Sequence, residues 1–413
     1  MSRKKIVIAG CGPAGMMAAW QAAKNDADVL ILEKMDKPGL KLCITGKGRC
    51  NLTNIADIPE TINHFNANGK FLRQAFSYFF NSDLIDYFQD RGLKVIMERG
   101  GRIFPESGKA KDVLDVMLNC IDKNQVMINT KSPVHDLIIE NSELKGVLAR
   151  GKKILCDGVI LATGGKSYPK TGSSGDGFAL AKKAGHTIMP LLPALVPLTV
   201  DGLDLNSLSD LNLRNVKVYL SVNGKQIKHK FGELGFIDTG ITGPVVLKLS
   251  HEIVQYIEKQ KTVSLSLDLK PALDDKKLEN RLLRDIATRG KETCPVFLRG
   301  LLPAPLIPIC LDAAGISHDQ YVSSITGQQR KAIRKWLKNF VIKIKGYRPL
   351  DEALVTAGGI DTKEINPRTM ESRIVKRLYF AGEIIDIHAD TGGFNLQAAF
   401  STGWLAGRSA AKN

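Results

Sequence analysis

The first residues of this sequence whose types and spacing suit a chemical role are glycines. Residues 10–15 read GCGPAG, which fits G-x-G-x-x-G, between the apolar run IVIA and a run rich in helix-forming residues. In such a turn Gly10 permits the tight bend, Gly12 lets the backbone approach a pyrophosphate, and Gly15 lets helix and strand pack closely. Pro13 and Ala14 open the helix, whose free amino-terminal N–H groups attract phosphate. The segment predicts a dinucleotide site.

A carboxylate follows where that site needs one. Glu33 ends a second apolar strand, DVLILEK, 18 residues after Gly15, the expected place for an acceptor of ribose hydroxyls. Lys34, next to it, is included in the predicted site. A strand–helix turn without a ligand has the same glycine pattern, but strand, helix, second strand and terminal acid together favour a bound dinucleotide.

Two further strand-and-glycine segments lie far along the chain. ILATGG places Ala162, Thr163 and Gly164 at the end of one apolar strand, and LYFAGE places Gly382 and Glu383 at the end of another. Glycines at such ends allow the backbone to cross close over a dinucleotide. Glu383 can accept the hydroxyls of a ribityl chain.

A third segment, TGGFNLQAAFSTGWLAG, begins a helix after two glycines. It contributes Gly393, Asn395 and Leu396 to the predicted site. The amino-terminal N–H groups of this helix can stabilise negative charge on a reduced flavin ring. An NAD site does not need a covering segment from near the carboxyl end of the chain, whereas the longer FAD does, so these segments together favour FAD.

The elements that must position these residues are of two kinds. In 1–190 and 349–413, short apolar strands, glycine turns and helices alternate, as expected for buried parallel strands. In 191–348, alternating strands such as VKVYLSVNGKQIKHK precede amphipathic basic helices at about 270–340. We predict an α/β protein with a discontinuous, Rossmann-like FAD-binding domain and an inserted domain, part small β-barrel or sheet and part helical.

Composition limits the classes of ligand and the cellular compartment to expect for this protein. The 413 residues carry a net charge of +16, and 217–348 holds 23 Lys and Arg against 12 Asp and Glu. A basic balance fits phosphate-bearing ligands, acidic substrates, nucleic acid or an anionic membrane surface. The seven cysteines form no C-x-x-C pair, which favours a reducing cytoplasm and argues against disulfides or a metal site. The sequence predicts no membrane span and does not indicate an oligomeric state.

Five segments together resemble one known family, and the resemblance covers nearly the whole chain. The segments GCGPAGMMAA, GLKLCITGKGRCNLTN, ATGG, TMESRIVKRLYFAGE and TGGFNLQAAFSTG are similar to those of bacterial FAD-dependent oxidoreductases. This family includes aminoacetone oxidase and a flavoprotein that reduces 3-dehydro-bile acids. It implies a discontinuous FAD domain with a β-barrel and helical insert.

The resemblance also implies further cofactor contacts. It places the 41–51 loop along the FAD, with contributions from Lys41, Gly48, Arg49 and Asn51, and it places Val134 beside the adenine. Family members usually carry a third glycine where this chain has Lys47. The side chain of Lys47 must therefore point away from the cofactor or reach the substrate.

Catalytic candidates are weak. His388, just before the flavin-facing glycines, can exchange a proton near neutral pH, and Tyr168 lies in a loop that leads to the substrate side. A structural loop histidine explains His388 as well, and Asp176 is better explained as a helix cap. The sequence contains no convincing catalytic pair.

Several functions fit a flavoprotein of this design. We expect a reductase or dehydrogenase acting on a small organic molecule, with NAD(P)H docking transiently because the chain has no second strand–G-x-G-x-x-G–helix unit. The alternative within this class is an amine oxidase of the aminoacetone type that passes electrons to oxygen. An RNA-binding flavoprotein that uses the basic insert is disfavoured, since Trp336 and Phe340 fit an apolar helix face. A non-catalytic FAD sensor is the remaining hypothesis.

Overall fold

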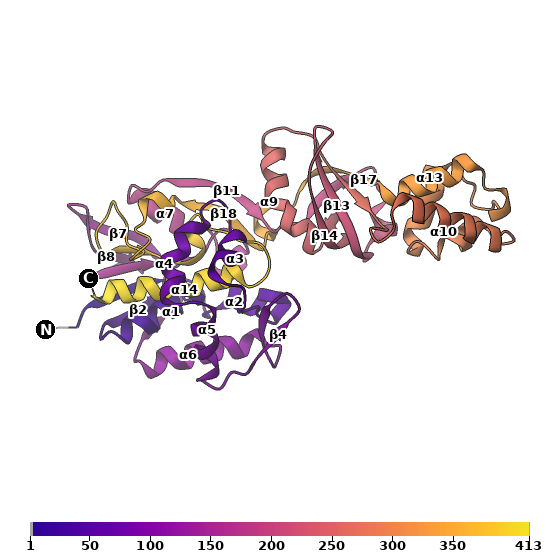
Figure 1. Ribbon diagram of the computed structural model, residues 1–413. Coiled ribbons are helices and arrows are strands. Elements are labelled where there is room, and N and C mark those ends of the chain that lie inside the picture. Colours follow the sequence, from indigo (N-terminus) through magenta and orange to yellow (C-terminus); the bar gives the residue numbers. More distant parts are fainter. Residues whose placement is uncertain (1–2, 413) are drawn as a thin grey trace. The chain divides into compact units, whose positions relative to one another are not determined.

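The computed structural model describes residues 3–412, which form two compact units (Figure 1). The first unit contains the chain up to Ala194 and from Pro349 onward, and the second contains Leu195–Arg348. The sequence had placed these boundaries after residues 190 and 348. Within the described residues no helix combines the length and apolar character needed to cross a bilayer.

A five-stranded parallel sheet forms the centre of the first unit. Its continuous apolar runs are buried on both faces, as parallel strands covered by helices must be. Ala9 pairs with Leu32 on one side and with Leu161 on the other, so that the carboxyl ends of three strands meet at one edge. The strand order is β19 (Leu378–Phe380), β10 (Gly158–Leu161), β1 (Lys5–Ala9), β2 (Asp28–Leu32), β6 (Met127–Asn129).

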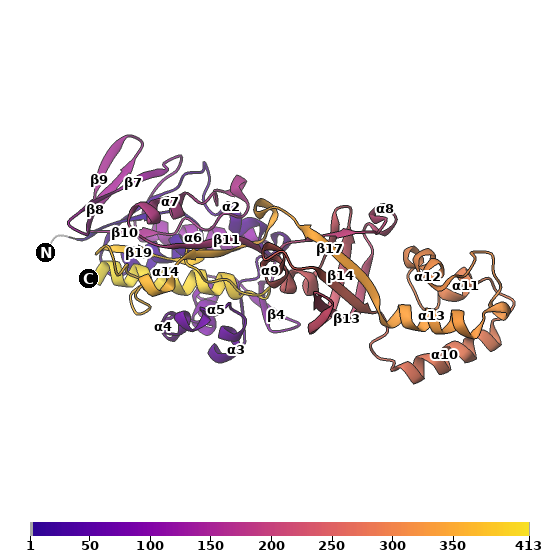
Figure 2. The ribbon, with the colours of Figure 1, turned by 90° about the horizontal axis from the view of Figure 1, so that it is seen from above.

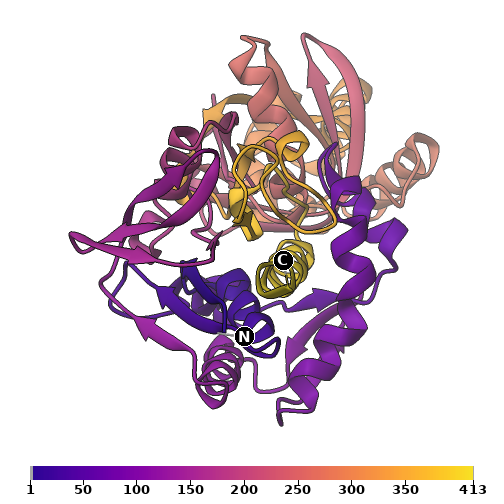
Figure 3. The ribbon, with the colours of Figure 1, turned by 90° about the vertical axis from the view of Figure 1, so that its left-hand side faces the viewer.

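Two helices from opposite ends of the chain pack against each other beside this sheet. They are α1 (Pro13–Ala23) and α14 (Phe394–Lys412), and Figure 3 shows α14 nearly end-on. A β-carbon on Gly403 would overlap Ala14 O, and one on Gly407 would overlap Ala18 O. Glycine at these two positions therefore permits a backbone contact that fixes α14 beside the Gly10–Gly15 turn.

Other elements of the first unit surround this centre. A hairpin turns at Gly100 and Gly101, as the sequence predicted. The smaller sheets are β3 (Thr53–Asn54), β5 (Arg102–Pro105), β4 (Val95–Glu98); β7 (Val134–Glu140), β8 (Glu143–Ala149), β9 (Lys152–Leu155); and β11 (Ile188–Ala194), β18 (Val355–Ile360). The helices are α2 (Leu40–Ile44), α3 (Ile58–Asn63), α4 (Arg73–Tyr78), α5 (Asn81–Gln89), α6 (Ala110–Lys123) and α7 (Asp176–Lys183).

The second unit contains a closed six-stranded barrel, which confirms the predicted β-barrel insert. Alternate residues of its strands, such as Val218, Leu220 and Leu265, point inward and are fully buried. Its strands, in order, are β12 (Leu198–Asp201), β15 (Gly240–Thr242), β14 (Lys225–Ile237), β13 (Asn212–Val222), β16 (Val263–Asp268), β17 (Phe340–Tyr347). Helices α8 (Leu205–Leu208) and α9 (Pro244–Glu258) complete this part.

Four helices lie between β16 and β17 in the sequence and form the helical part of this unit (Figure 2). They are α10 (Asp275–Thr288), α11 (Cys294–Leu298), α12 (Ile307–Ala314) and α13 (Gly327–Lys338). The basic side chains of α13 pair with α10: Arg330 Nε lies 2.7 Å and Arg334 Nη1 3.2 Å from Glu279 carboxylate oxygens. The adjoining face of α13 buries Ile333 and Leu337, so this basic helix is an ordinary amphipathic helix.

Candidate functional site

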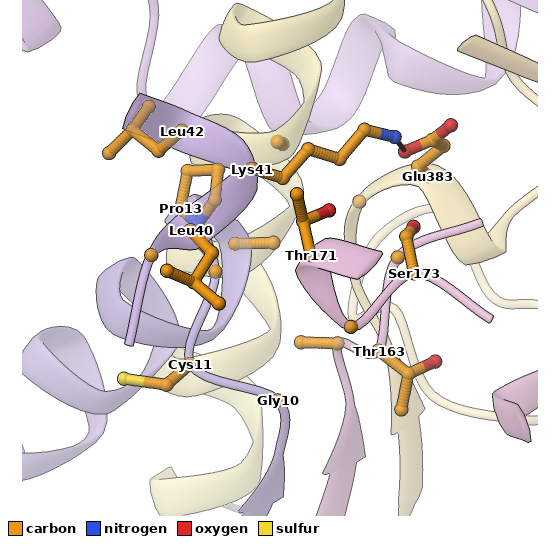
Figure 4. Close-up of a pocket in the computed structure, with 18 of the residues that line it drawn as sticks. Gly10, Cys11, Pro13, Leu40, Lys41, Leu42, Thr163, Thr171, Ser173 and Glu383 are labelled. Atoms are coloured by element: carbon orange, nitrogen blue, oxygen red, sulfur yellow. Dashed lines mark hydrogen bonds and ion pairs between the residues drawn. The ribbon is translucent and has the colours of Figure 1, made fainter. Parts of the chain in front are cut away.

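A pocket opens at the carboxyl edge of the parallel sheet, where ligands bind in folds of this type (Figure 4). It receives the ends of β1, β2 and β10, the segment after β19, and the start of α14. Most of the residues predicted to bind a cofactor line it. They are Gly10, Gly12, Pro13, Ala14, Glu33, Lys34, Lys41, Val134, Ala162, Thr163, Gly164, Gly382, Glu383, Asn395 and Leu396.

The glycines of the first turn have three different roles. Gly10 has φ of +103°, and a β-carbon there would lie 2.5 Å from Ala162 O. Gly12 has φ of −86°, and among the described residues no atom lies within 4 Å of a β-carbon added to it. Gly15 does not line the pocket, since a β-carbon there would overlap Gly10 O. Gly10 and Gly15 thus shape the turn, and Gly12 leaves open space in front of the α1 amino terminus.

Glu33 is held in place by backbone groups. Its Oε2 accepts a hydrogen bond from Cys11 N at 2.7 Å, and its Oε1 accepts one from Met35 N at 2.8 Å. Each carboxylate oxygen keeps a further lone pair for hydroxyl donors on the pocket side. Lys34 turns toward another partner, because its Nζ lies 2.6 Å from Asp176 Oδ2.

An ion pair joins opposite walls of the pocket. Lys41 Nζ lies 2.6 Å from Glu383 Oε2, and it also donates to Ser167 Oγ at 2.7 Å. Glu383 Oε1 accepts a hydrogen bond from Thr356 N at 2.8 Å. Burial raises the pKa of Glu383, but the Lys41 charge and these hydrogen bonds outweigh it and hold the pKa below its usual value. Glu383 is therefore a carboxylate acceptor at neutral pH, and Figure 4 shows the Lys41 side chain reaching it.

The amino terminus of α14 forms another part of the wall. Asn395 fixes the preceding loop, because its side chain accepts from Ala389 N and donates to Ala389 O, both at 2.9 Å. The first hydrogen bond of the helix runs from Gln397 N to Gly393 O. The N–H groups of the first turn, at residues 394–396, precede this bond and favour a negatively polarised ligand group.

Two hydroxyl groups beside the pocket, Thr163 Oγ1 and Ser173 Oγ, have no hydrogen-bond partner among the described residues. Both oxygens are inaccessible to solvent, and each lies against a glycine, Thr163 Oγ1 against Gly177 and Ser173 Oγ against Gly164. They therefore face the protein rather than the pocket.

The comparisons with known proteins agree with this geometry. A model of the HI0933-like protein Rossmann domain matches residues 4–409. The chain belongs to the HI0933-like family. It is 33% identical over 412 residues to the 3-dehydro-bile acid delta(4,6)-reductase of Clostridium scindens, covering 99% of each chain.

A second relative has another kind of substrate in its name. The chain is 30% identical over 406 residues to the ribosomal RNA dihydrouridine synthase of Escherichia coli, covering 98% of this chain and 97% of that one. The solved 3-ketosteroid delta1-dehydrogenase of Sterolibacterium denitrificans has a TM-score of 0.51 at 12% identity, covers 100% of both chains, and shows a shared fold. The expected family, the Rossmann-like fold with a barrel, and the class of FAD-dependent oxidoreductase are confirmed.

The G-R-C-N loop of this HI0933-like protein lies differently from the expectation. Gly48, Arg49, Asn51 and Gly393 do not line the pocket. Arg49 pairs with Glu98, and its guanidinium lies 4.4 Å from the centre of the Phe104 ring. The Asn51 amide accepts from Gly393 N at 3.0 Å, so the loop supports the start of α14 from behind.

Lys47 occupies the position where the family resemblance led us to expect a glycine. Its φ of +58° is left-handed, and its side chain is exposed. The left-handed region disfavours residues with a β-carbon, which gives the family's glycine a physical reason. The Lys47 side chain does not line the pocket.

The two catalytic candidates also lie outside the pocket lining. His388 is 7% exposed, and its carbonyl accepts a hydrogen bond from Asn66 N at 2.9 Å. Tyr168 has φ of +55° and is half-buried; burial and the nearby Glu352 charge raise the pKa of its hydroxyl. These positions give both residues a structural explanation.

Some lining residues were missed from the sequence. Leu40, Thr171 and Ser173 line the pocket, and Ser167 supports the Lys41–Glu383 pair. The serines and Thr171 belong to the segment GGKSYPKTGSSGDGF, whose composition signals only a polar loop. The repeated glycines were a usable signal, because glycine-rich loops often let the backbone approach a ligand.

Proposed function

We propose that this protein is an FAD-dependent reductase that saturates a carbon–carbon double bond conjugated to a carbonyl group. The two relatives described above are named for reactions of this kind. The two delta(4,6) double bonds of a 3-dehydro steroid are conjugated to the 3-keto group, and the bond reduced to form dihydrouridine is conjugated to a uracil carbonyl. The bound flavin supplies the hydride in such chemistry, and the protein supplies binding, orientation and electrostatics.

The pocket that joins Glu33 to the start of α14 carries this proposal. An FAD molecule would place its ribose hydroxyls on Glu33, its diphosphate at the open Gly12, and its adenine beside Val134. The Glu383 carboxylate suits the hydroxyl groups between the two ends of the cofactor. The N–H groups of α14 suit the electron-rich end of a flavin.

The electron donor in this proposal is NADH or NADPH, bound only for the transfer. The sequence holds a single G-x-G-x-x-G turn between a strand and a helix, and the FAD would occupy it. The nicotinamide must therefore reach the flavin from the substrate side and leave before the substrate binds. Oxygen is the alternative partner, as electron acceptor, in an oxidase of the aminoacetone type.

Visible absorption spectra recorded under anaerobic conditions distinguish the reductase from the oxidase. The purified protein, loaded with FAD, is titrated with NADH, then with NADPH, and finally with a 4-ene-3-keto steroid. Bleaching by either nucleotide and recovery of the oxidised spectrum with the steroid are the expected results. If neither nucleotide bleaches the flavin but an amine does, the protein is an oxidase rather than a reductase. Failure to bind FAD would contradict the proposal as a whole.

Uridine in RNA is a second candidate substrate. The full-length likeness to a ribosomal RNA dihydrouridine synthase and the excess of basic residues in 217–348 both favour it. In the helical part, the pairing of α13 with α10 accounts for two of these basic residues, Arg330 and Arg334. An RNA contact must therefore rely on basic residues elsewhere, and the barrel carries several.

A further inference from the structure

We propose that the outer face of barrel strands β14, β13, β16 and β17 binds single-stranded RNA. This inference rests on the proposed reductase function and names RNA as the source of the conjugated double bond. It is carried by side chains of the barrel unit alone. The features that support it are the register of the four strands, their exposed rings, and their charge.

Strand pairing places the outward residues of these strands in rows. In the first row, Phe231 lies opposite Lys217, which lies opposite Asp268. The second row runs His229, Tyr219, Ser266, Val341, and the third runs Gln226, Ser221, Ser264, Lys343. On β13, β16 and β17 the residues between them, such as Val218 and Leu265, point into the barrel and are fully buried, and the pairing of β13 with β14 shifts register before the third row. The rows therefore form one continuous outer surface.

Aromatic rings stand among small neighbours on this surface. Phe231 is 59% exposed, and the Tyr219 ring lies 5.7 Å from that of His229. Beside Tyr219, strand β16 presents only the short side chains of Ser264 and Ser266. Lys217 lies over the Tyr219 ring, so Phe231 is the ring on which a flat base can stack, as bases do on the sheets of single-strand binding proteins.

The charge of the surface complements a phosphate backbone. Lys217 lies 5.2 Å from the centre of the Tyr219 ring, and Lys343 and Lys345 are exposed along β17, with Asp201 of the neighbouring strand β12 opposite Lys343. Asp268, the acid of the first row, is buried and neutralised by Lys338, whose Nζ lies 2.6 Å from its Oδ2. Aromatic stacking positions flanked by lysines fit a single strand of RNA, which presents bases and phosphates alternately.

Fluorescence anisotropy with the FAD-loaded full chain and a labelled 12-nucleotide oligouridine tests the proposal. Phe231→Ala should raise Kd about 5- to 100-fold, because one stacked base is lost. Phe231→Tyr retains a ring and should bind within about threefold of wild type. Tyr321→Ala is the matched control, since Tyr321 is an exposed aromatic residue (58%) in the helical part and should leave Kd unchanged.

Salt dependence adds a second readout. Lys343→Gln should reduce the slope of log K against log salt by about 0.7, the value for one phosphate contact to a single strand. Thermal melting and the flavin spectrum of each variant establish that the fold and the cofactor are retained. A wild-type protein that does not bind the oligonucleotide, or Phe231→Ala and Lys343→Gln variants that bind like wild type, would overturn the proposal.

Other outcomes identify the competing explanations. If the wild type dimerises in sedimentation experiments and Phe231→Ala abolishes this without changing RNA affinity, the surface is a contact between two copies and the proposal is wrong. Turnover of the 4-ene-3-keto steroid is measured on the same samples. Steroid reduction without RNA binding would overturn the proposed RNA surface and leave the proposed reductase function standing. A flavin that accepts no electrons from NADH or NADPH would overturn the reductase function itself.

Discussion

Lys41 and Glu383 are 342 residues apart in the sequence, yet Lys41 Nζ lies 2.6 Å from Glu383 Oε2 inside the pocket. Lys41 belongs to helix α2, and Glu383 follows strand β19. The pair thus links the first and last segments of the Rossmann unit across the proposed cofactor site. Ser167, from a third segment, hydrogen-bonds to both side chains.

Replacing one member of this pair should weaken both the fold and cofactor binding. Lys41→Met leaves a mostly buried carboxylate without its counter-ion, so the free energy of unfolding should fall by about 1–3 kcal/mol. Urea unfolding of the apoprotein measures this loss, and fluorescence titration with FAD measures affinity. The double variant Lys41→Met with Glu383→Gln should recover part of the stability. Equal losses in the single and double variants would contradict this account.

The same pair predicts a pH dependence. The pKa of Glu383 is lowered in the folded state from its usual 4.5, so the folded protein binds the Glu383 proton less tightly than the unfolded chain does. The contribution to stability is fully present above that usual value and is lost as the pH falls through the lower, folded value. Unfolding free energies measured from pH 6 to pH 3 should therefore decline less steeply for Glu383→Gln than for wild type.

Two neighbouring glycines should respond differently to alanine. Gly12→Ala meets no neighbour and keeps an allowed backbone, so the apoprotein should melt like wild type. Its methyl group enters the space proposed for the diphosphate, and we expect at least about a tenfold loss of FAD affinity, or 1.4 kcal/mol. Gly10→Ala should instead destabilise the fold by about 1–3 kcal/mol, because its β-carbon would press on Ala162 O. Identical behaviour of the two variants would argue against separate roles.

Lys47 offers a test of backbone strain. Lys47→Gly removes a β-carbon from a left-handed residue and should raise the unfolding free energy by up to about 1 kcal/mol. Lys47→Val should lower it, because a β-branched residue tolerates positive φ poorly. FAD affinity should stay constant in both variants, since this side chain is exposed and outside the pocket. A drop in affinity for Lys47→Gly would show that the lysine contacts the cofactor.

Local patterns predicted the parts of the site that depend on local geometry. The Gly10–Gly15 turn and Glu33 lie within one strand–helix–strand unit, so their spacing alone fixes their relation to the sheet edge. The barrel was expected from alternating strands and from the family resemblance. Positions such as Gly382 and Asn395 were identified because each follows a strand or begins a helix that reaches the same edge.

Contacts between distant segments could not be predicted in this way. Arg49 was expected near the cofactor, but its side chain turns to Glu98 and Phe104, residues of a hairpin that sequence spacing does not place. The unsatisfied Ser173 hydroxyl depends on how its loop folds over Gly164. Tertiary packing determines where loop side chains point, and this packing cannot be predicted from a single sequence.

The contact of α14 with α1 has a consequence for synthesis of the chain. Residues 195–348 form a unit with its own apolar core, and all of them precede α14 in the chain. The pocket, by contrast, lacks the segment after β19, with Glu383, and the α14 wall until those residues have been translated. On the ribosome the barrel unit can therefore fold first, while the cofactor site is completed only late, when α14 emerges and packs on a helix translated near the start.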